Sequence, residues 1–183
     1  EFPRDIIITV DDDYIYDRHL VRDLMRAHQK NKIAICTLVG WRMVFDRKLG
    51  NLLHRGDWLF EKKILANPSH ELFIRGPYTL YPPNSLDRRV FDIDTIKRFC
   101  QNGENGVIGY DDSWLKCMAT LKSSKVINAR KFKILFDNSE IISSQVSSLG
   151  ADCIGDNYEG VKAQELFNFF GLNDNDFKDK KVV

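Results

Sequence analysis

The feature that most constrains this chain is a short apolar run that ends in three acids. Residues 6–10 read Ile-Ile-Ile-Thr-Val, and Asp11, Asp12 and Asp13 follow without an intervening turn residue. Runs of β-branched residues favour a buried strand. Three carboxylates at the end of a buried strand repel one another and lose hydration, so a positive partner is expected beside them. A hard divalent cation with oxygen ligands fits that requirement; the alternative is a solvated acidic turn.

Composition indicates one globular domain and excludes several classes of partner. The 27 basic and 26 acidic residues nearly cancel among 183, so no net field favours nucleic acid. The four cysteines show no paired spacing, which argues for reduced thiols rather than a zinc site or a disulfide framework. No apolar run reaches the roughly 18 residues of a membrane span, and no secretory signal opens the chain. We therefore expect a cytoplasmic protein.

Strands alternate with helices along the chain, which predicts an α/β sandwich. Beyond the first strand, the pattern predicts strands over about 33–39, 125–128 and 131–136, and helices over about 17–30, 94–101, 110–121 and 160–170. Aromatic and basic residues alternate over 41–71, which favours a hydrophobic flap or a loop closing over a ligand rather than a site for single-stranded nucleic acid. We expect one domain over 1–172 and a polar tail over 173–183 that frays.

A second candidate segment reads Gly76-Pro77-Tyr78-Thr79-Leu80-Tyr81-Pro82-Pro83. Gly76 permits unusual backbone angles, while Pro82 and Pro83 remove two N–H donors and stiffen the chain. A rigid loop of this kind is costly to keep unless it holds a particular shape.

A third candidate segment is the acidic pair Asp111-Asp112, which opens a predicted helix. The helix dipole and free N–H groups favour an ionised carboxylate there, so one of the two can act as a base at neutral pH. The alternative is ordinary helix capping, since Asp is a preferred cap residue. Because one residue occupies the cap, the other acid still requires an explanation.

These three segments, in this order and spacing, resemble those of nucleotide-sugar glycosyltransferases of the GT-A fold, and more narrowly the bacterial enzymes that build surface polysaccharides or lipopolysaccharide. The resemblance covers roughly residues 1–170 and implies an α/β/α sandwich with a mixed sheet. Members usually carry two or three strands before the strand that ends in the acidic DXD motif. Since this chain enters that strand almost at once and lacks an initiator Met, we expect it to be truncated and to lack the first strands of the nucleotide-binding half.

The resemblance also implies residue roles. Asp13, with Asp11, would ligate Mn²⁺ or Mg²⁺, while Asp11 and Asp12 would contact the water on the metal or the ribose of the nucleotide. Asp112, with Asp111 beside it, would deprotonate the acceptor hydroxyl in an inverting transfer. The sugar and acceptor pocket would be formed by Gly76, Tyr81, Pro82, Pro83 and Trp114, with Trp114 packing the helix beside the site.

The implied substrates are a nucleotide-diphosphate sugar and a glycan or lipid-linked acceptor, and the latter would place the protein at the inner face of the membrane. The chain departs from the pattern in two places. The segment before the Tyr-Pro-Pro sequence lacks the expected run of glycines, and no histidine follows His70, so water or phosphate would complete the metal shell.

Two other functions remain open. In a phosphatase of the haloacid-dehalogenase type, Asp11 would be a covalent nucleophile, Asp13 would follow it, Thr37 would supply a hydroxyl and the pair Asp111-Asp112 would hold the metal. Against this, Ile15 is not the residue expected there and the Tyr-Pro-Pro segment has no role. The other alternative is a non-catalytic transferase remnant, which would show no Mn²⁺-dependent binding of nucleotide sugars.

Overall fold

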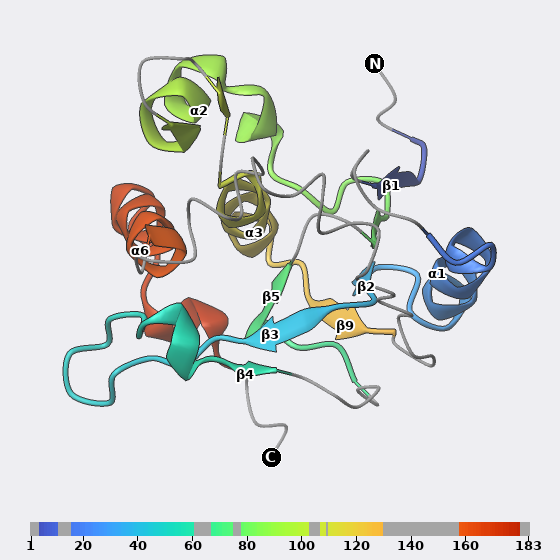
Figure 1. Cartoon of the computed structure of the whole chain (residues 1–183), viewed down its shortest axis with the longest axis horizontal. Helices are drawn as coiled ribbons and strands as arrows, with labels where there is room; N and C mark the ends of the chain where they lie inside the picture. Colours follow the sequence, from blue (N-terminus) through green and yellow to red (C-terminus); the bar gives the residue numbers. More distant parts are fainter. Residues whose placement is uncertain are drawn as a thin grey trace, which may run out of the picture.

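The computed structural model describes residues 4–10, 16–60, 67–74, 78–102, 107–108, 110–129 and 158–179. Among them it contains the α-helices α1 (Leu20–Lys30), α2 (Ile93–Cys100), α3 (Asp111–Leu121) and α6 (Tyr158–Phe169) (Figure 1). Short 3-10 turns are η1 (Arg55–Asp57), η2 (Arg88–Phe91) and η4 (Asp174–Phe177). The helices predicted over 94–101, 110–121 and 160–170 are confirmed with small shifts at their ends. The helix predicted from Asp17 begins three residues later, because Asp17 accepts a hydrogen bond from the His19 amide and forms a turn before it.

The main sheet is mixed and has the strand order β1-β6-β2-β9. Its strands are β1 (Ile7–Thr9), β6 (Thr79–Tyr81), β2 (Ile35–Thr37) and β9 (Val126–Asn128). The strand β6 is antiparallel to both of its neighbours, while β2 and β9 are parallel. Consequently β1, β2 and β9 all run in the same direction and end at the same edge of the sheet. The predicted α/β class is thereby confirmed, and the sheet is mixed as expected.

A second sheet and a short ribbon complete the described β-structure. The second sheet has the order β4-β3-β5 and is antiparallel throughout, with β3 (Gly40–Arg42), β4 (Leu59–Phe60) and β5 (Leu72–Ile74). The ribbon pairs β7 (Gln101–Asn102) with β8 (Val107–Ile108). The strand predicted over 131–136 lies outside the described residues.

The prediction of a flap or ligand-closing loop over 41–71 is wrong, because this segment supplies strands and core. Trp58 is buried, and its ring lies 4.9 Å from that of Phe73. The indole of Trp58 also donates a hydrogen bond to the Leu53 carbonyl at 2.9 Å. These aromatic residues therefore fill the space beneath the second sheet.

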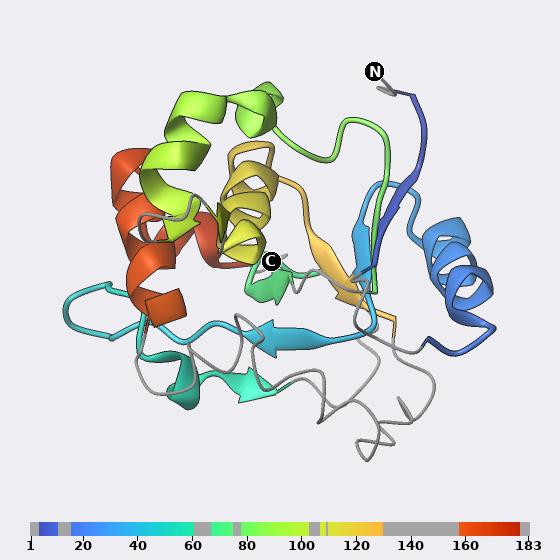
Figure 2. The same cartoon turned by 45° about the horizontal axis from the view of Figure 1, so that its top comes forward.

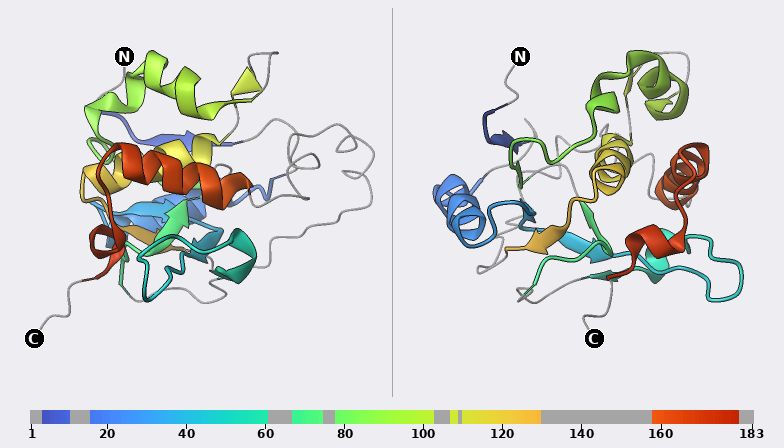
Figure 3. Two further views of the ribbon diagram at one scale, coloured as in Figure 1. Left: turned by 90° about the vertical axis from the view of Figure 1, so that its left-hand side faces the viewer. Right: turned by 180° about the vertical axis from the view of Figure 1, so that it is seen from behind.

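The main sheet lies between α1 on one face and α3 on the other, with α6 beyond α3 (Figures 1 and 3). Because side chains alternate along a strand, successive residues face the two helices in turn. Cys36, Leu80 and Ile127 pack with Leu20 and Leu24 of α1. The face toward α3 carries a second cluster, which consists of Ile35, Leu72, Ile74, Tyr81, Ala119 and Val126.

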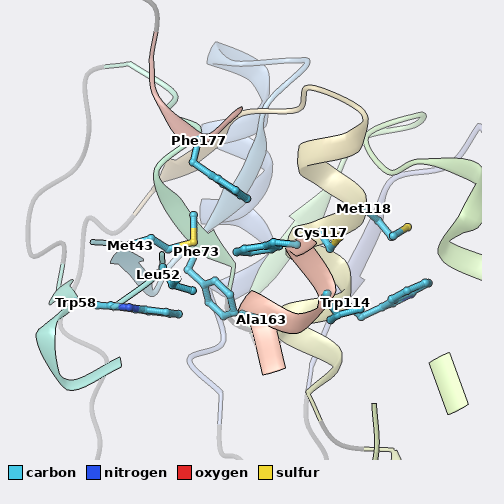
Figure 4. Packing of buried hydrophobic residues seen from close by; sticks show 11 residues of the cluster. Met43, Leu52, Trp58, Phe73, Trp114, Cys117, Met118, Ala163 and Phe177 are labelled. Carbon is cyan, nitrogen blue, oxygen red and sulfur yellow. The ribbon is translucent and has the colours of Figure 1, made fainter. Parts of the chain in front are cut away.

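The largest core cluster lies between α3, α6 and the second sheet (Figure 4). Trp114 and Cys117 of α3 belong to it together with Ala163, Leu166 and Phe167 of α6, and Phe177 joins it from η4. The Phe177 ring lies 4.5 Å from Phe167 and 5.2 Å from Phe45. The prediction of a frayed polar tail is therefore wrong for 173–179: one large apolar side chain anchors an otherwise polar segment, and an Asn173 capping box starts its 3-10 turn.

The first strand is confirmed but is not fully buried as predicted. Ile7 is 50% exposed, and Ile6 and Val10 are also exposed. The reason is its place at the edge of the main sheet, where it pairs with β6 and with no other strand among the described residues.

Candidate functional site

Polar side chains form one row across the main sheet where its parallel strands end. Thr9 pairs with Thr79, Thr79 pairs with Thr37, and Thr37 pairs with Asn128. Thr9, Thr37 and Asn128 are the last residues of β1, β2 and β9. We call these four residues the polar row. In open α/β sheets, ligands bind outside the carboxyl ends of the strands, so the polar row marks the edge where a site is expected.

The polar row is held by hydrogen bonds between strands that are distant in sequence. The Thr79 hydroxyl donates to the Thr37 hydroxyl at 3.2 Å, and the Thr37 hydroxyl donates to the Val39 carbonyl at 2.8 Å. The Thr9 hydroxyl donates to the Thr79 carbonyl at 3.3 Å. Thr37, Thr79 and Asn128 are fully buried, so these bonds form away from water, where an unmade bond is costly. The ends of β1, β6 and β2 are thereby fixed relative to one another.

The amino end of α3 points toward the same edge. The helix ends in a Schellman motif, in which the amides of Ser123 and Ser124 donate to the carbonyls of Thr120 and Ala119. The turn leads directly into β9, so the helix and the strand run in opposite directions (Figure 2). As β9 ends at the polar row, the first turn of α3 lies toward it.

Asp111 and Asp112 occupy that first turn, but neither is the cap. Tyr110 occupies the cap position and makes no capping hydrogen bond through its side chain. Asp111 is exposed and Asp112 is half-buried. Neither Asp111 nor Asp112 therefore occupies the cap position that the alternative requires. Both carboxylates lie in the first turn, where the helix dipole favours negative charge.

Tyr81, the partner of Ile7 in β1, is a buried residue whose phenol is affected by the acidic pair. Its side chain is 3% exposed, and burial raises the pKa of its phenol well above the ordinary value. The charge of Asp112, and more weakly that of Asp111, raises this pKa further, while the Thr9 side chain lowers it. The phenol therefore senses side chains from both β1 and α3.

Two tyrosines beside this edge have strained backbones. Tyr110, directly before Asp111, has φ 61°, and Tyr78, directly before β6, has φ 73°. The left-handed region costs a residue with a side chain about 1–2 kcal/mol. The Tyr78 amide donates to the Thr9 carbonyl and its carbonyl accepts from the Leu38 amide, both at 3.1 Å. Strain of this kind is concentrated at functional sites, where the surrounding structure holds it in place.

The remaining predicted site residues are placed as follows. Asp11, Asp12, Asp13 and Gly76 lie outside the described residues; β1 ends at Thr9, two positions before Asp11. Pro82 is buried and Pro83 is exposed.

Tyr81 and Trp114 are core residues. The Trp114 indole donates to the Val90 carbonyl at 3.2 Å, so this buried residue joins α3 to η2. The rigid loop expected around residue 80 is instead the strand β6 followed by a turn, in which the Ser85 amide donates to the Pro82 carbonyl at 3.2 Å.

Sequence reasoning missed the polar row and Tyr78. The available signal was a threonine at the end of each of two apolar runs, Thr9 and Thr37. The other two members of the polar row require the strand register, which no local pattern encodes. Thr37, the hydroxyl considered for a phosphatase, is fully buried and engaged with Val39 and Thr79.

Within the described residues, no group of three His, Cys, Asp or Glu side chains could hold a metal ion. The proposed ligands Asp11 and Asp13 lie outside that part of the chain. Their carboxylate oxygens are the donors that Mg²⁺ and Mn²⁺ prefer, so the donor set fits such an ion. No helix in the described part of the chain has the length and apolar character to cross a bilayer.

Comparisons with family models, with curated proteins and with solved structures found no match to this chain.

Proposed function

We propose that this protein is a metal-dependent glycosyltransferase that moves a sugar from a nucleotide-diphosphate sugar to a hydroxyl of a glycan or lipid-linked acceptor, with inversion. The observation that supports the proposal is that the first turn of α3, which carries Asp111 and Asp112, lies toward the edge of the main sheet where β1 ends. In sequence β1 leads to Asp11-Asp12-Asp13, and the charges of Asp112 and Asp111 act on the phenol of Tyr81, whose partner in β1 is Ile7. Donor binding and acceptor activation would need this proximity.

Asp112 is the proposed base. It lies in the first turn of α3, where the unpaired amides favour its ionised form, and an ionised carboxylate can accept the proton of an acceptor hydroxyl. It is half-buried, so the surroundings hold it while one side stays accessible. Asp111 is more exposed and would add negative charge that favours proton uptake by its neighbour.

Asp13 and Asp11 are the proposed ligands for Mn²⁺ or Mg²⁺, which when bound would neutralise the charge of the diphosphate leaving group. The hydroxyl of Thr9 and the antiparallel pairing of β1 with β6 fix the end of β1, the strand that precedes these acids in sequence. Asp12 is the proposed contact to the nucleotide ribose.

The finer fold that we propose is the GT-A type. The mixed sheet, with one antiparallel strand between two parallel strands and helices on both faces, supports this assignment. In such a fold the strand ends at the polar row would form the floor of the donor site. The turn at Pro82 and Pro83 follows the opposite end of β6, so the structure does not support their predicted place in the acceptor pocket.

The test combines binding with turnover. Thermal unfolding of the protein is measured with UDP- and GDP-sugars, with and without Mn²⁺, because a ligand that binds the folded state raises its melting temperature. Asp13→Ala should abolish the Mn²⁺-dependent rise. Asp112→Asn should keep it but lower kcat by about 100-fold or more. Asp94→Asn is a matched control, since Asp94 also lies in the first turn of an exposed helix, α2.

Three results would contradict the proposal in different ways. Normal turnover by Asp112→Asn would show that Asp112 is not the base. Hydrolysis of p-nitrophenyl phosphate, with an aspartyl-phosphate analogue trapped at Asp11, would identify a phosphatase. Absence of any Mn²⁺-dependent binding of nucleotide sugars would leave a non-catalytic protein.

A further inference from the structure

The outward side of α1 carries a row of basic side chains. The helix packs Leu20 and Leu24 on the main sheet, so its opposite side faces solvent (Figure 3). Its basic residues recur at every fourth position, a spacing that brings helical side chains to one side, about 6 Å apart along the axis. We call these residues, with one lysine that follows the helix, the basic face: Arg18, Arg22, Arg26, Lys30 and Lys32. All five are exposed.

The basic face concentrates positive charge in a chain that is otherwise nearly neutral. Residues 17–33 hold five basic and two acidic side chains, a net charge of +3, while the whole chain carries +1. Asp23 is the acid beside the row: its Oδ1 lies 3.0 Å from Arg22 Nε and 3.8 Å from Arg26 Nη1. Ion pairs at an exposed surface are weak, so an external anion can compete for these arginines. The basic face is therefore complementary to a surface with many negative charges.

Two exposed aliphatic side chains accompany the basic face. Val21 of α1 is 57% exposed, and Ile33, directly after Lys32, is 88% exposed. Aliphatic side chains gain by entering the apolar boundary of a bilayer, where neighbouring cations meet the lipid phosphates. Nucleic acid is bound through aromatic side chains on which bases stack, and residues 17–33 contain no Phe, Tyr or Trp. The combination of basic and aliphatic side chains favours an anionic lipid surface over nucleic acid.

We propose that the basic face of α1 docks the protein on an anionic lipid bilayer, with Ile33 entering the headgroup boundary and the arginines on lipid phosphates. A guanidinium can donate two parallel hydrogen bonds to one phosphate. Each basic side chain near such a surface strengthens binding about fivefold. The purpose of the docking rests on the proposed function, since a lipid-linked acceptor would be met at the same surface. The docking itself is measured without turnover.

The experiment measures co-sedimentation of the intact protein with lipid vesicles. Vesicles of phosphatidylcholine and phosphatidylglycerol should bind the protein, while phosphatidylcholine alone should bind it about tenfold less or weaker still. About 1 M salt should release it, because charges are then screened within about 3 Å. Arg22→Gln/Arg26→Gln should weaken binding to the anionic vesicles about tenfold or more. Ile33→Ser should weaken it about fivefold and leave its salt dependence unchanged.

Arg47→Gln/Lys48→Gln is the matched control. It removes two exposed charges from the segment that follows β3, the cyan loop on the side of the molecule away from α1 (Figures 1 and 2). This variant should bind anionic vesicles as the unmodified protein does. If both double variants lost binding equally, the attraction would be a general effect of net charge and the inference would be overturned. All the substituted side chains are exposed, and the lipid and salt comparisons need no variant.

The remaining outcomes separate a lipid surface from other anions. Single-stranded DNA that binds as tightly as the anionic vesicles, and equally well to Ile33→Ser, would identify a nucleic-acid site and overturn the inference. Release of the vesicles by inorganic phosphate, but not by chloride of the same ionic strength, would identify a phosphate site and also overturn it. So would absence of binding to anionic vesicles by the unmodified protein. Vesicle binding without sugar transfer would refute the proposed function and leave the docking surface standing.

Discussion

The buried residue Lys116 leads to a specific prediction about how the free energy of unfolding depends on pH. This lysine lies in the middle of α3 and is fully buried. Its ammonium donates to the His70 carbonyl at 2.7 Å and lies 5.6 Å from the centre of the Phe177 ring. Burial lowers the pKa of Lys116 from 10.5 to about 7, and the charge of Asp179 only partly opposes this. The lysine therefore loses its proton in the folded protein near neutral pH.

The sign of the effect follows from proton binding. Between pH 7 and pH 10.5 the unfolded chain holds a proton on this lysine that the folded chain has mostly released, so the free energy of unfolding rises with pH in that window. Below pH 7 the cost of the buried charge is fully present, about 5 kcal/mol for the whole shift. Between pH 7 and pH 9 the expected gain in stability is about 2 kcal/mol.

The assay compares urea unfolding of the unmodified protein and of Lys116→Met at pH 7, 8 and 9. The variant loses the bond to the His70 carbonyl, which shifts its stability by a constant amount. The buried charge is identified by the pH dependence of the difference in free energy of unfolding between the two proteins. This difference should change by about 2 kcal/mol between pH 7 and pH 9. Lys122→Met, at an exposed position of the same α3–β9 region, should give a difference that does not vary with pH.

Other titratable groups lie near this lysine. Comparison of the unmodified protein with Lys116→Met separates the effect of Lys116 from theirs, because both proteins contain those other groups. The pKa of His70 is lowered by burial first and then by Lys116. For Asp179, partial burial is the largest single effect and raises the pKa, but hydrogen bonds from Ser69, Lys125 and the His70 amide together lower it. Cys117 adjoins the lysine on α3. Parallel stability curves for the unmodified protein and Lys116→Met would refute the reasoning, since they would show that the buried amine does not titrate between pH 7 and pH 9.

Three further substitutions test other parts of the fold by urea unfolding. Ser123→Gly should stabilise the protein by about 1 kcal/mol, because Ser123 has φ 57° at the end of α3, where glycine is unstrained; no gain would refute this. Thr79→Val should destabilise by about 1 kcal/mol, since the buried hydroxyl bond to Thr37 is lost; an unchanged midpoint would show that the polar row contributes no stability. Phe177→Ala should cost about 3–5 kcal/mol if the C-terminal segment is core, and almost nothing if it is a tail.

The parts of the fold that the sequence predicted are those with a local cause. The helix α3 follows from an apolar stripe that begins after two acids, and α2 from a first-turn aspartate and a short amphipathic pattern. Both helices can be predicted from local sequence without reference to distant segments. The strands β3 and β4 are three and two residues long, too short for a period to be visible, and they exist because each finds a partner far along the chain.

Burial was predicted less well than secondary structure, because burial depends on topology. The apolar run at β1 reads as a core strand, yet its place at the sheet edge leaves Ile7 half exposed. The opposite error concerns Lys116, which in sequence resembles any helix lysine but is covered by the segment that carries Phe177. Neither outcome can be read from the residue and its neighbours.

The candidate site likewise combines features with a local cause and features that depend on topology. Sequence alone placed Asp111 and Asp112 at the start of a helix, and the resemblance then singled out Asp112 as the base. What places Asp112 near the end of β1 is non-local: the Thr9–Thr79 pairing fixes β1 against β6, and the Tyr81 ring then packs against α3. A substitution that disturbs the pairing of β6 between β1 and β2 should therefore shift the first turn of α3 relative to the end of β1 without touching Asp112 itself.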